Sequence, residues 1–361
     1  MKRFVSIGML VLAPLWPTAC SEPPQMAEEG TLSVVIPADV VATKGSDVNA
    51  FACEQVVNQV QVLLFKEGTR CDYCVLDAHD VTFPYTKFYP SLGEGIYQVY
   101  VVANGPDVSG ARTENALLST AVSLADCGLT VSDGFVMANG TSVAIRPGVA
   151  AQVSVPLQRF ASRVRVVSVT NGLPETYADG GAMTVKGIFL INALGQWNLG
   201  GIGDPSGWVN LGGRTAGRQA STDRNDYIRT AKQVPAAYRA HLFRSGTVTI
   251  ARNGRQTYDD ACFYTFPNGV TTDRPGPSAT EQTGAPVRLV VLARVNGADW
   301  WYPVTLVRDG MGLQRNTTCD VSLTICATGS SDPNEPVTKM QLKASFVNTG
   351  WNSGANYSEP L

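Results

Sequence analysis

The stretch Cys71-Asp72-Tyr73-Cys74, followed by His79, has residue types and a spacing that could bind a metal ion. Two thiolates separated by two residues are half of the ligand set of a structural zinc site. The second pair of ligands is missing, because the other histidine, His241, lies far along the chain. Exported chains more often form disulfides. We therefore predict no metal site and expect a local disulfide, with Cys53 or Cys127 as other candidate partners.

Nucleophilic catalysis by a Ser-His-Asp or Cys-His arrangement would have to use His79 or His241, the two histidines of the chain. Neither lies near a recognisable nucleophile motif, and no Gly-x-Ser-x-Gly, His-Glu-x-x-His or P-loop string occurs. We predict that the chain is not an enzyme and that it needs no cofactor.

Three adjacent aromatic residues, Trp300-Trp301-Tyr302, could form a platform on which a sugar ring stacks. Paired aromatic residues in a β-sandwich more often belong to the core. Glycan binding and core packing are therefore the two interpretations of this stretch.

Cys20 is a candidate for lipid attachment. Residues 1–19 contain Met1-Lys2-Arg3 and then the apolar run Phe4 to Trp16, which is typical of a secretory signal and too short for a spanning helix. The following Pro17-Thr18-Ala19-Cys20 resembles a bacterial lipobox, in which the cysteine is lipidated and becomes the first residue of the mature chain. Several acyl chains on one cysteine hold a protein on a membrane better than a single chain does.

Seven cysteines remain after Cys20, so at least one thiol is free. Cys319 and Cys326 lie seven residues apart, on opposite faces of a regular strand, and we expect them to pack separately. Without Lys2 and Arg3, 26 basic side chains stand against 30 acidic ones, a formal charge of −4. This balance argues against a nucleic-acid partner.

Short strands separated by turns are the main secondary-structure signal. With 361 residues, 44% hydrophobic and 16% charged, the chain suits two domains of ordinary size. Spacings of about 8 to 12 residues between strands are typical of a β-sandwich. We expect a domain boundary at Gln158-Arg159-Phe160, a short helical pattern at Thr113 to Leu124, and strands that include Thr31 to Pro37, Val56 to Phe65, Gly95 to Asn104, 135–140, 142–148, Ala151 to Leu157, Arg163 to Val169, Met183 to Ala193 and Val287 to Val295.

The last strand, which we expect from Lys339 onward, alternates apolar and polar residues. Met340, Leu342, Ala344 and Phe346 fall on one side, which is the period of a half-buried strand. Trp351 follows as an aromatic anchor. Such a strand forms the edge of its own sheet or completes the sheet of another copy.

The segment Ala38 to Ala50 has a turn-like centre at Lys44-Gly45-Ser46-Asp47 and is expected to be an exposed loop. Exposed loops with a basic residue beside glycine are sites of proteolysis. A solvated loop lysine is the simpler interpretation of Lys44 taken alone.

Several motifs, in the same order along the chain, resemble those of the fimbrillins, the pilin subunits of Bacteroidales-type fimbriae. They are Phe135 to Asn139, Ile145 to Gly148, Leu157 to Val164, Phe263 to Asn268, Leu313 to Asn316, Asp320 to Ile325, Gly329 to Val337 and Trp351. The resemblance extends over nearly all of the chain after the signal peptide.

The resemblance implies an all-β chain with two transthyretin-like Greek-key β-sandwich domains and few short helices. It implies a lipoprotein signal peptide at 1–19, a tether and removable first strand at 20–44, an N-terminal domain at 45–159 and a C-terminal domain at 160–361. The terminal donor strand would be 337–361.

In such pilins a protease removes the first strand at the cell surface, and the groove that it leaves accepts the C-terminal strand of the next subunit. The cut in this chain would fall between Lys44 and Gly45, where the best-known members carry arginine before the cut. The donor residues would be Met340, Leu342, Ala344, Phe346 and Trp351. Donor and acceptor lie at opposite ends of the chain, so the contact is head-to-tail and builds a filament.

We therefore expect a precursor anchored in the outer membrane through Cys20, and then an extracellular fimbrium that supports adhesion. The expected partners are other copies of the chain, other fimbrial subunits and a ligand on a host or bacterial surface. The alternatives are an anchor or tip subunit that does not polymerise, and a monomeric surface lipoprotein that binds glycans.

Overall fold

The computed structural model of the chain describes residues 29–37, 52–54, 56–77, 82–128, 134–201, 207–213, 236–276, 282–351 and 358–360. The predicted signal peptide, lipid attachment at Cys20 and cleavage between Lys44 and Gly45 lie outside these residues. Within the described ranges no helix is long and apolar enough to cross a membrane.

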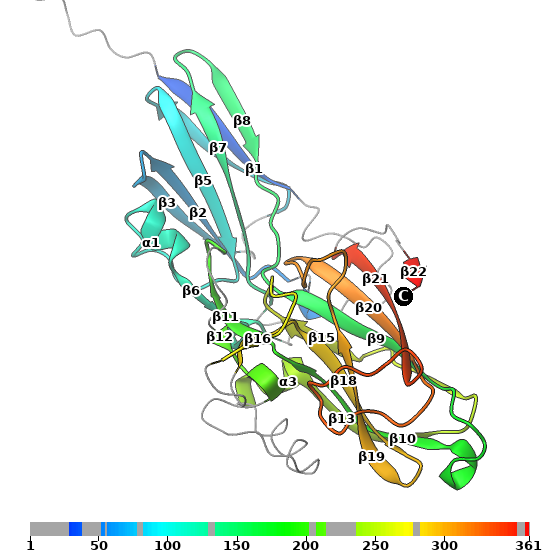
Figure 1. The fold of residues 1–361 in the computed structure, drawn as a ribbon. Coiled ribbons are helices and arrows are strands. Elements are labelled where there is room, and N and C mark those ends of the chain that lie inside the picture. Colours follow the sequence, from blue (N-terminus) through cyan, green and yellow to red (C-terminus); the bar gives the residue numbers. More distant parts are fainter. Residues whose placement is uncertain are drawn as a thin grey trace, which may run out of the picture.

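Two sheets occupy one end of the molecule (Figure 1). The three-stranded sheet has the order β4-β1-β8, with β1 at Gly30–Ile36, β4 at Tyr85–Leu92 and β8 at Ala150–Ser154. The four-stranded sheet has the order β3-β2-β5-β7, with bounds Thr69–Asp77, Gln59–Lys66, Gly95–Ala103 and Met137–Ile145.

The core of this end contains residues from both sheets. Its buried side chains come from alternate positions of the strands, among them Leu32 and Val34 of β1, Val62 of β2 and Val99 of β5. Alternation places every second side chain on the same face of a strand. The first strand is therefore part of the core and not an appendage to it.

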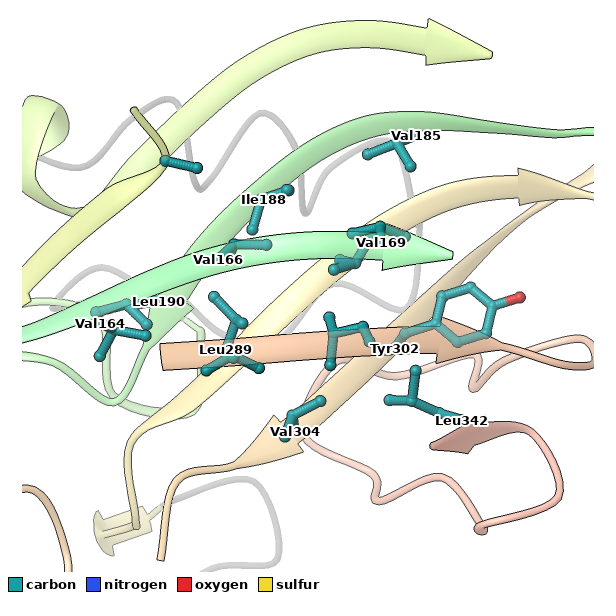
Figure 2. Packing of buried hydrophobic residues seen from close by; sticks show 14 of the residues in the cluster. Val164, Val166, Val169, Val185, Ile188, Leu190, Leu289, Tyr302, Val304 and Leu342 are labelled. Atoms are coloured by element: carbon teal, nitrogen blue, oxygen red, sulfur yellow. The ribbon is translucent and has the colours of Figure 1, made fainter. Parts of the chain in front are cut away.

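Two further sheets occupy the other end (Figure 1). One has the order β13-β10-β18-β19, with bounds Phe243–Ile250, Met183–Ile191, Arg288–Val295 and Ala298–Thr305. The other has the order β14-β9-β20-β21-β22, with bounds Arg255–Thr257, Ser162–Asn171, Thr317–Ile325, Leu342–Gly350 and Ser358–Pro360, and β15 (Cys262–Thr265) also pairs with β9. Figure 2 shows valines of β9, such as Val166, among side chains of β10 and β18 in the shared core.

A third core cluster contains residues from both ends of the molecule. It includes Phe65 of β2, Phe135, Phe160, Tyr264 of β15 and Trp351. The remaining small elements are β6 (Ala121–Ser123), β11 (Leu194–Asn198), β12 (Gly207–Trp208), β16 (Arg274–Pro275), β17 (Gln282–Gly284), α1 (Glu114–Leu118), α3 (Ala236–Leu242), and the 3₁₀ turns η2 (Ala52–Glu54), η4 (Leu124–Asp126), η5 (Ala178–Gly181) and η6 (Leu211–Gly213).

The structure corrects two local predictions. β7 runs without a turn through Asn139 and Gly140, because Gly140 lies against the ring of Tyr100 and a Cβ there would come within 2.4 Å of it. Glycine at this position therefore allows the Tyr100 ring to lie close to the backbone of β7 and does not form a turn. The helix is also shorter than expected, since α1 begins after its cap Thr113 and ends at Leu118.

Candidate functional site

The first strand is the central strand of its sheet. β1 pairs antiparallel with β4, with Leu32 opposite Tyr89 and Ile36 opposite Tyr85. On its other side it pairs in parallel with β8, with Leu32 opposite Ala151. Backbone donors and acceptors therefore face a partner strand on both sides, and β1 provides no free edge.

The inward side chains of β1 fill an apolar slot completely. Leu32, Val34 and Ile36 are fully buried, whereas the alternating Ser33 and Val35 are half-buried on the opposite face. Burial of an aliphatic side chain of this size stabilises a protein by roughly 1.5–3 kcal/mol. The three together make β1 a large contributor to the stability of this end.

The slot is closed at the start of β1. A Cβ built on Gly30 would lie 2.6 Å from the carbonyl oxygen of Arg146 and 2.6 Å from Cγ2 of Ile145. Real Cβ atoms do not approach other atoms so closely, so this position accepts glycine alone unless the neighbouring backbone moves. The slot therefore holds three large side chains and ends at Gly30.

The terminal strand belongs to the other end of the molecule. β21 pairs antiparallel with β20 over nine positions, from Thr317 opposite Gly350 to Ile325 opposite Leu342. Its outer edge pairs with β22 over three positions. Leu342 and Phe346 are buried in the core, and Figure 2 shows Leu342 near Tyr302 and Val304.

The predicted donor residues are not equivalent in the subunit. Ala344 is half-buried on β21. Met340 precedes the strand and is 84% exposed. The strand begins at Leu342 and not at Lys339, because the amides of Gln341 and Leu342 donate to the carbonyl oxygen of Thr338, at 2.9 and 3.0 Å, and close a turn.

An open groove of about 320 Å³ lies beside β21. Apolar side chains of β19 and β21 line it, together with Val337 from the preceding link. The terminal strand therefore lies at the margin of its core, unlike β1.

Trp351, directly after β21, is held by a buried polar cluster. Its Nε1 donates to Oε2 of Glu54 at 3.2 Å, and its ring stacks on Tyr264 with centroids 5.9 Å apart. Nη1 of Arg163 lies 2.6 Å from the same Glu54 oxygen. Burial, followed by the negative charge of Glu54, raises the pKa of Tyr264, so that its hydroxyl stays protonated and donates to Oε1 of Glu54 at 2.6 Å.

The sequence analysis identified Trp351 but missed the residues around it. Glu54, Arg163 and Tyr264 are distant in sequence, and nothing local shows that they meet. The available signal was a charge near the start of a strand with apolar positions: Arg163 is the second residue of β9, where a buried charge requires a partner.

The cysteines do not form the expected local disulfide. All seven cysteines of the described residues are free. Cys71 and Cys74 lie on β3, and residues three apart on a strand point to opposite faces. Cys319 packs in the core. No group of three or more His, Cys, Asp or Glu side chains in the described part of the chain could hold a metal ion.

The aromatic run on β19 does not form a surface platform. Trp301 and Tyr302 are fully buried, and Trp300 is half-buried against the core. Tyr302 donates to the carbonyl oxygen of Ala327 at 2.8 Å. Core packing is therefore the correct interpretation of this stretch.

Comparisons with known proteins give a family match over part of the chain and a fold match over most of it. Residues 30–156 match the family described as "Major fimbrial subunit protein (FimA)". No curated protein gives a significant match.

Among solved structures, the chain is similar to a proposed cell adhesion protein from Parabacteroides distasonis ATCC 8503, with 19% identity and a TM-score of 0.58 over 90% of this chain and 99% of that one. A fimbrilin (fimA) from Porphyromonas gingivalis W83 is 13% identical, with a TM-score of 0.56 over 90% of this chain and 98% of that one. A proposed cell adhesion protein from Bacteroides eggerthii DSM 20697 is 18% identical, with a TM-score of 0.56 over 90% and 97%. The fold is mostly β and fimbrilin-like, which confirms the predicted all-β class.

Proposed function

Because residues 30–156 match the family of major fimbrial subunit proteins (FimA), we propose that the chain is a fimbrial subunit that polymerises by donor-strand exchange. The family is one of structural subunits and not of enzymes. The match favours a location at the cell surface, in a fimbrium, and assembly with other fimbrial subunits.

The observation that carries the proposal is the central position of β1 between β4 and β8. Removal of β1 would bare two rows of backbone N–H and C=O groups and the slot of Leu32, Val34 and Ile36. Unpaired strand edges beside an apolar slot are costly in water. Such a groove would be filled most readily by another strand with the same alternation.

The terminal strand has this alternation. We propose that Leu342, Ala344 and Phe346 of one copy fill the places of Leu32, Val34 and Ile36 in the next. Met340 would pack at the rim, because the slot ends at Gly30. Trp351 would leave its own subunit with the same segment.

The placement of the two strands favours assembly between copies. β1 lies at one end of the molecule, and β21 lies in the sheets of the other end (Figure 1). A donor that leaves one end of a subunit and enters the opposite end of the next makes a heterologous contact, which does not close on itself. Repetition of this contact produces a filament.

Processing and anchoring complete the proposal. The precursor would carry a signal peptide at 1–19 and a lipid on Cys20, which holds it in the outer membrane. Cleavage between Lys44 and Gly45 would release the tether and first strand, 20–44. The mature chain would then form two transthyretin-like Greek-key β-sandwich domains, 45–159 and 160–361, with the donor segment at 337–361, and the fimbrium would support adhesion to a host or bacterial surface.

The N-terminus of protein taken from the cell surface tests this proposal. We expect mass spectrometry to find a chain that starts at Gly45 in the fimbrial fraction. A blocked, lipidated Cys20 on all recovered chains would contradict a polymerising subunit and support an anchor that keeps its first strand. The matched variant Lys44→Gln should keep β1 and remain outside fibres, whereas Lys66→Gln, which changes another lysine, should assemble normally.

A further inference from the structure

A buried ion pair lies where the end of β21 meets the opposite half of the molecule. Glu54 is fully buried and Arg163 is 2% exposed. Each comes from a different part of the chain, since Glu54 ends η2 and Arg163 lies near the start of β9. A buried charge requires close partners, so removal of one member of such a pair is strongly unfavourable.

Trp351 makes further contacts with this ion pair. Its indole N–H donates to the Glu54 carboxylate, and the guanidinium carbons of Arg159 and Arg163 lie 5.0 and 5.3 Å from its ring centroid. These distances are within the range of cation–π attraction, which is stronger in buried sites. Trp351 is itself 4% exposed. The end of β21 is therefore held by polar and cation–π contacts as well as by apolar packing.

The same cluster includes the segment that follows the predicted cut. Glu54 lies ten residues after Lys44 in the sequence. Arg159 donates from Nε to the backbone carbonyl oxygen of Glu54 at 2.8 Å, so both the main chain and the side chain of Glu54 are held. Segments close to a free terminus are poorly ordered unless they are tied down. Cleavage after Lys44 would bring η2 near such a terminus, where these contacts of Glu54 would have to hold it.

We propose that Glu54, Arg163 and Tyr264 form a latch that holds Trp351, and with it β21, in the subunit's own sheet, and that cleavage after Lys44 weakens this latch. The inference rests on the proposed donor-strand exchange and adds its regulation. An uncut subunit keeps its groove plugged by β1 and its donor strand locked. The cut opens the groove and loosens the donor strand through one covalent event.

Hydrogen exchange of the full chain, followed by mass spectrometry, tests the latch without reference to fibres. Peptides that cover 342–350 should exchange at least tenfold faster in Trp351→Ala and in Tyr264→Phe than in the unchanged chain. Tyr97→Phe is the matched control, because Tyr97 is also a buried tyrosine and its hydroxyl donates to the carbonyl oxygen of Gly93 at 2.9 Å, away from the cluster. The control should leave exchange at 342–350 within twofold.

Exchange in β2 and β5 reports whether each variant is folded. Unchanged protection there together with unchanged exchange at 342–350 in Trp351→Ala would overturn the latch. Should Trp351→Ala fail to fold, Tyr264→Phe alone decides, since it removes a single oxygen atom.

The link to cleavage has its own measurement. A full chain with a site-specific protease sequence inserted after Lys44 should show at least fivefold faster exchange at 342–350 once it is cut. Equal exchange before and after the cut would overturn this link. If the latch variants release β21 but the cut protein builds no fibres, the latch stands and donor-strand exchange fails. Fibres that form without any change of exchange would support donor-strand exchange and overturn the latch.

Discussion

β1 and β21 are both strands with alternate apolar side chains, but the molecule holds them in different ways. β1 lies between two partner strands, and its three inward side chains are fully buried. β21 has one long partner, β20, and an open groove beside it, and the residue after it enters a buried charge cluster. The first strand is thus paired on both edges within its core, whereas the last strand has one long partner and a polar anchor directly after it.

This difference has a consequence for exchange. A slot that recognises only apolar side chains and backbone groups accepts any strand with the right alternation. A strand that is fixed at one end by specific polar contacts can be released by a change at that end. In the proposed exchange the acceptor would be general and the donor would be controlled.

The largest expected effect on stability is that of truncation in β1. Leu32→Ala should lower the free energy of unfolding of the uncut chain by about 2–5 kcal/mol, because it leaves a cavity in a closed slot. Chemical denaturation measures the change. Ser33→Ala, on the opposite face, should stay within about 0.5 kcal/mol. Similar losses in both variants would show that β1 is not a core strand.

Truncation of a side chain in β21 should lower the free energy of unfolding less than truncation in β1. Leu342 is buried but lies beside the open groove, so its neighbours can move into the space that Leu342→Ala leaves. We expect a loss of about 2 kcal/mol, at the low end of the range for such changes. Denaturation of Leu342→Ala and Leu32→Ala under the same conditions gives the comparison directly. A larger loss for Leu342→Ala would reverse the contrast between the two strands.

Thiol labelling provides a smaller, local test of the cores. Burial raises the pKa of Cys127 and of Cys319 to about 12, and thiolate is the reactive form. Iodoacetamide at pH 8 should therefore modify Cys71, which is exposed on β3, and leave Cys127 and Cys319 unmodified. All should react after denaturation. Native labelling of Cys319 would show that the sheet containing β21 opens readily without any cut.

The sequence predicted both β1 and β21, the latter from its clear two-residue period. It missed β3 and β4 for a physical reason. Both are edge strands of their sheets, and they carry charged or proline residues such as Asp72, Lys87 and Pro90 in place of a regular apolar face. Edge strands are often marked in this way, and the pattern then resembles that of a loop.

The candidate site was only partly accessible to sequence reasoning. The alternation identified Leu342 and Phe346, and the aromatic Trp351 marked the end of the strand. The position of Met340 outside the strand depends on a turn that closes through Thr338, which the period did not reveal. The cluster of Trp351 joins residues that are 297 positions apart, and only the folded chain brings them together.

The alternation of side chains along β21 provides the most direct test of the central claim, that this strand is the donor. In a donor strand, Ala344 would face the apolar slot and the adjacent Ser345 would face away, while both are half-buried in the free subunit. Fibre growth from cleaved subunits, followed by light scattering and electron microscopy, should be abolished by Ala344→Asp and should persist with Ser345→Asp, provided that thermal unfolding shows both subunits to be folded. Normal fibres from folded Ala344→Asp subunits would contradict the account.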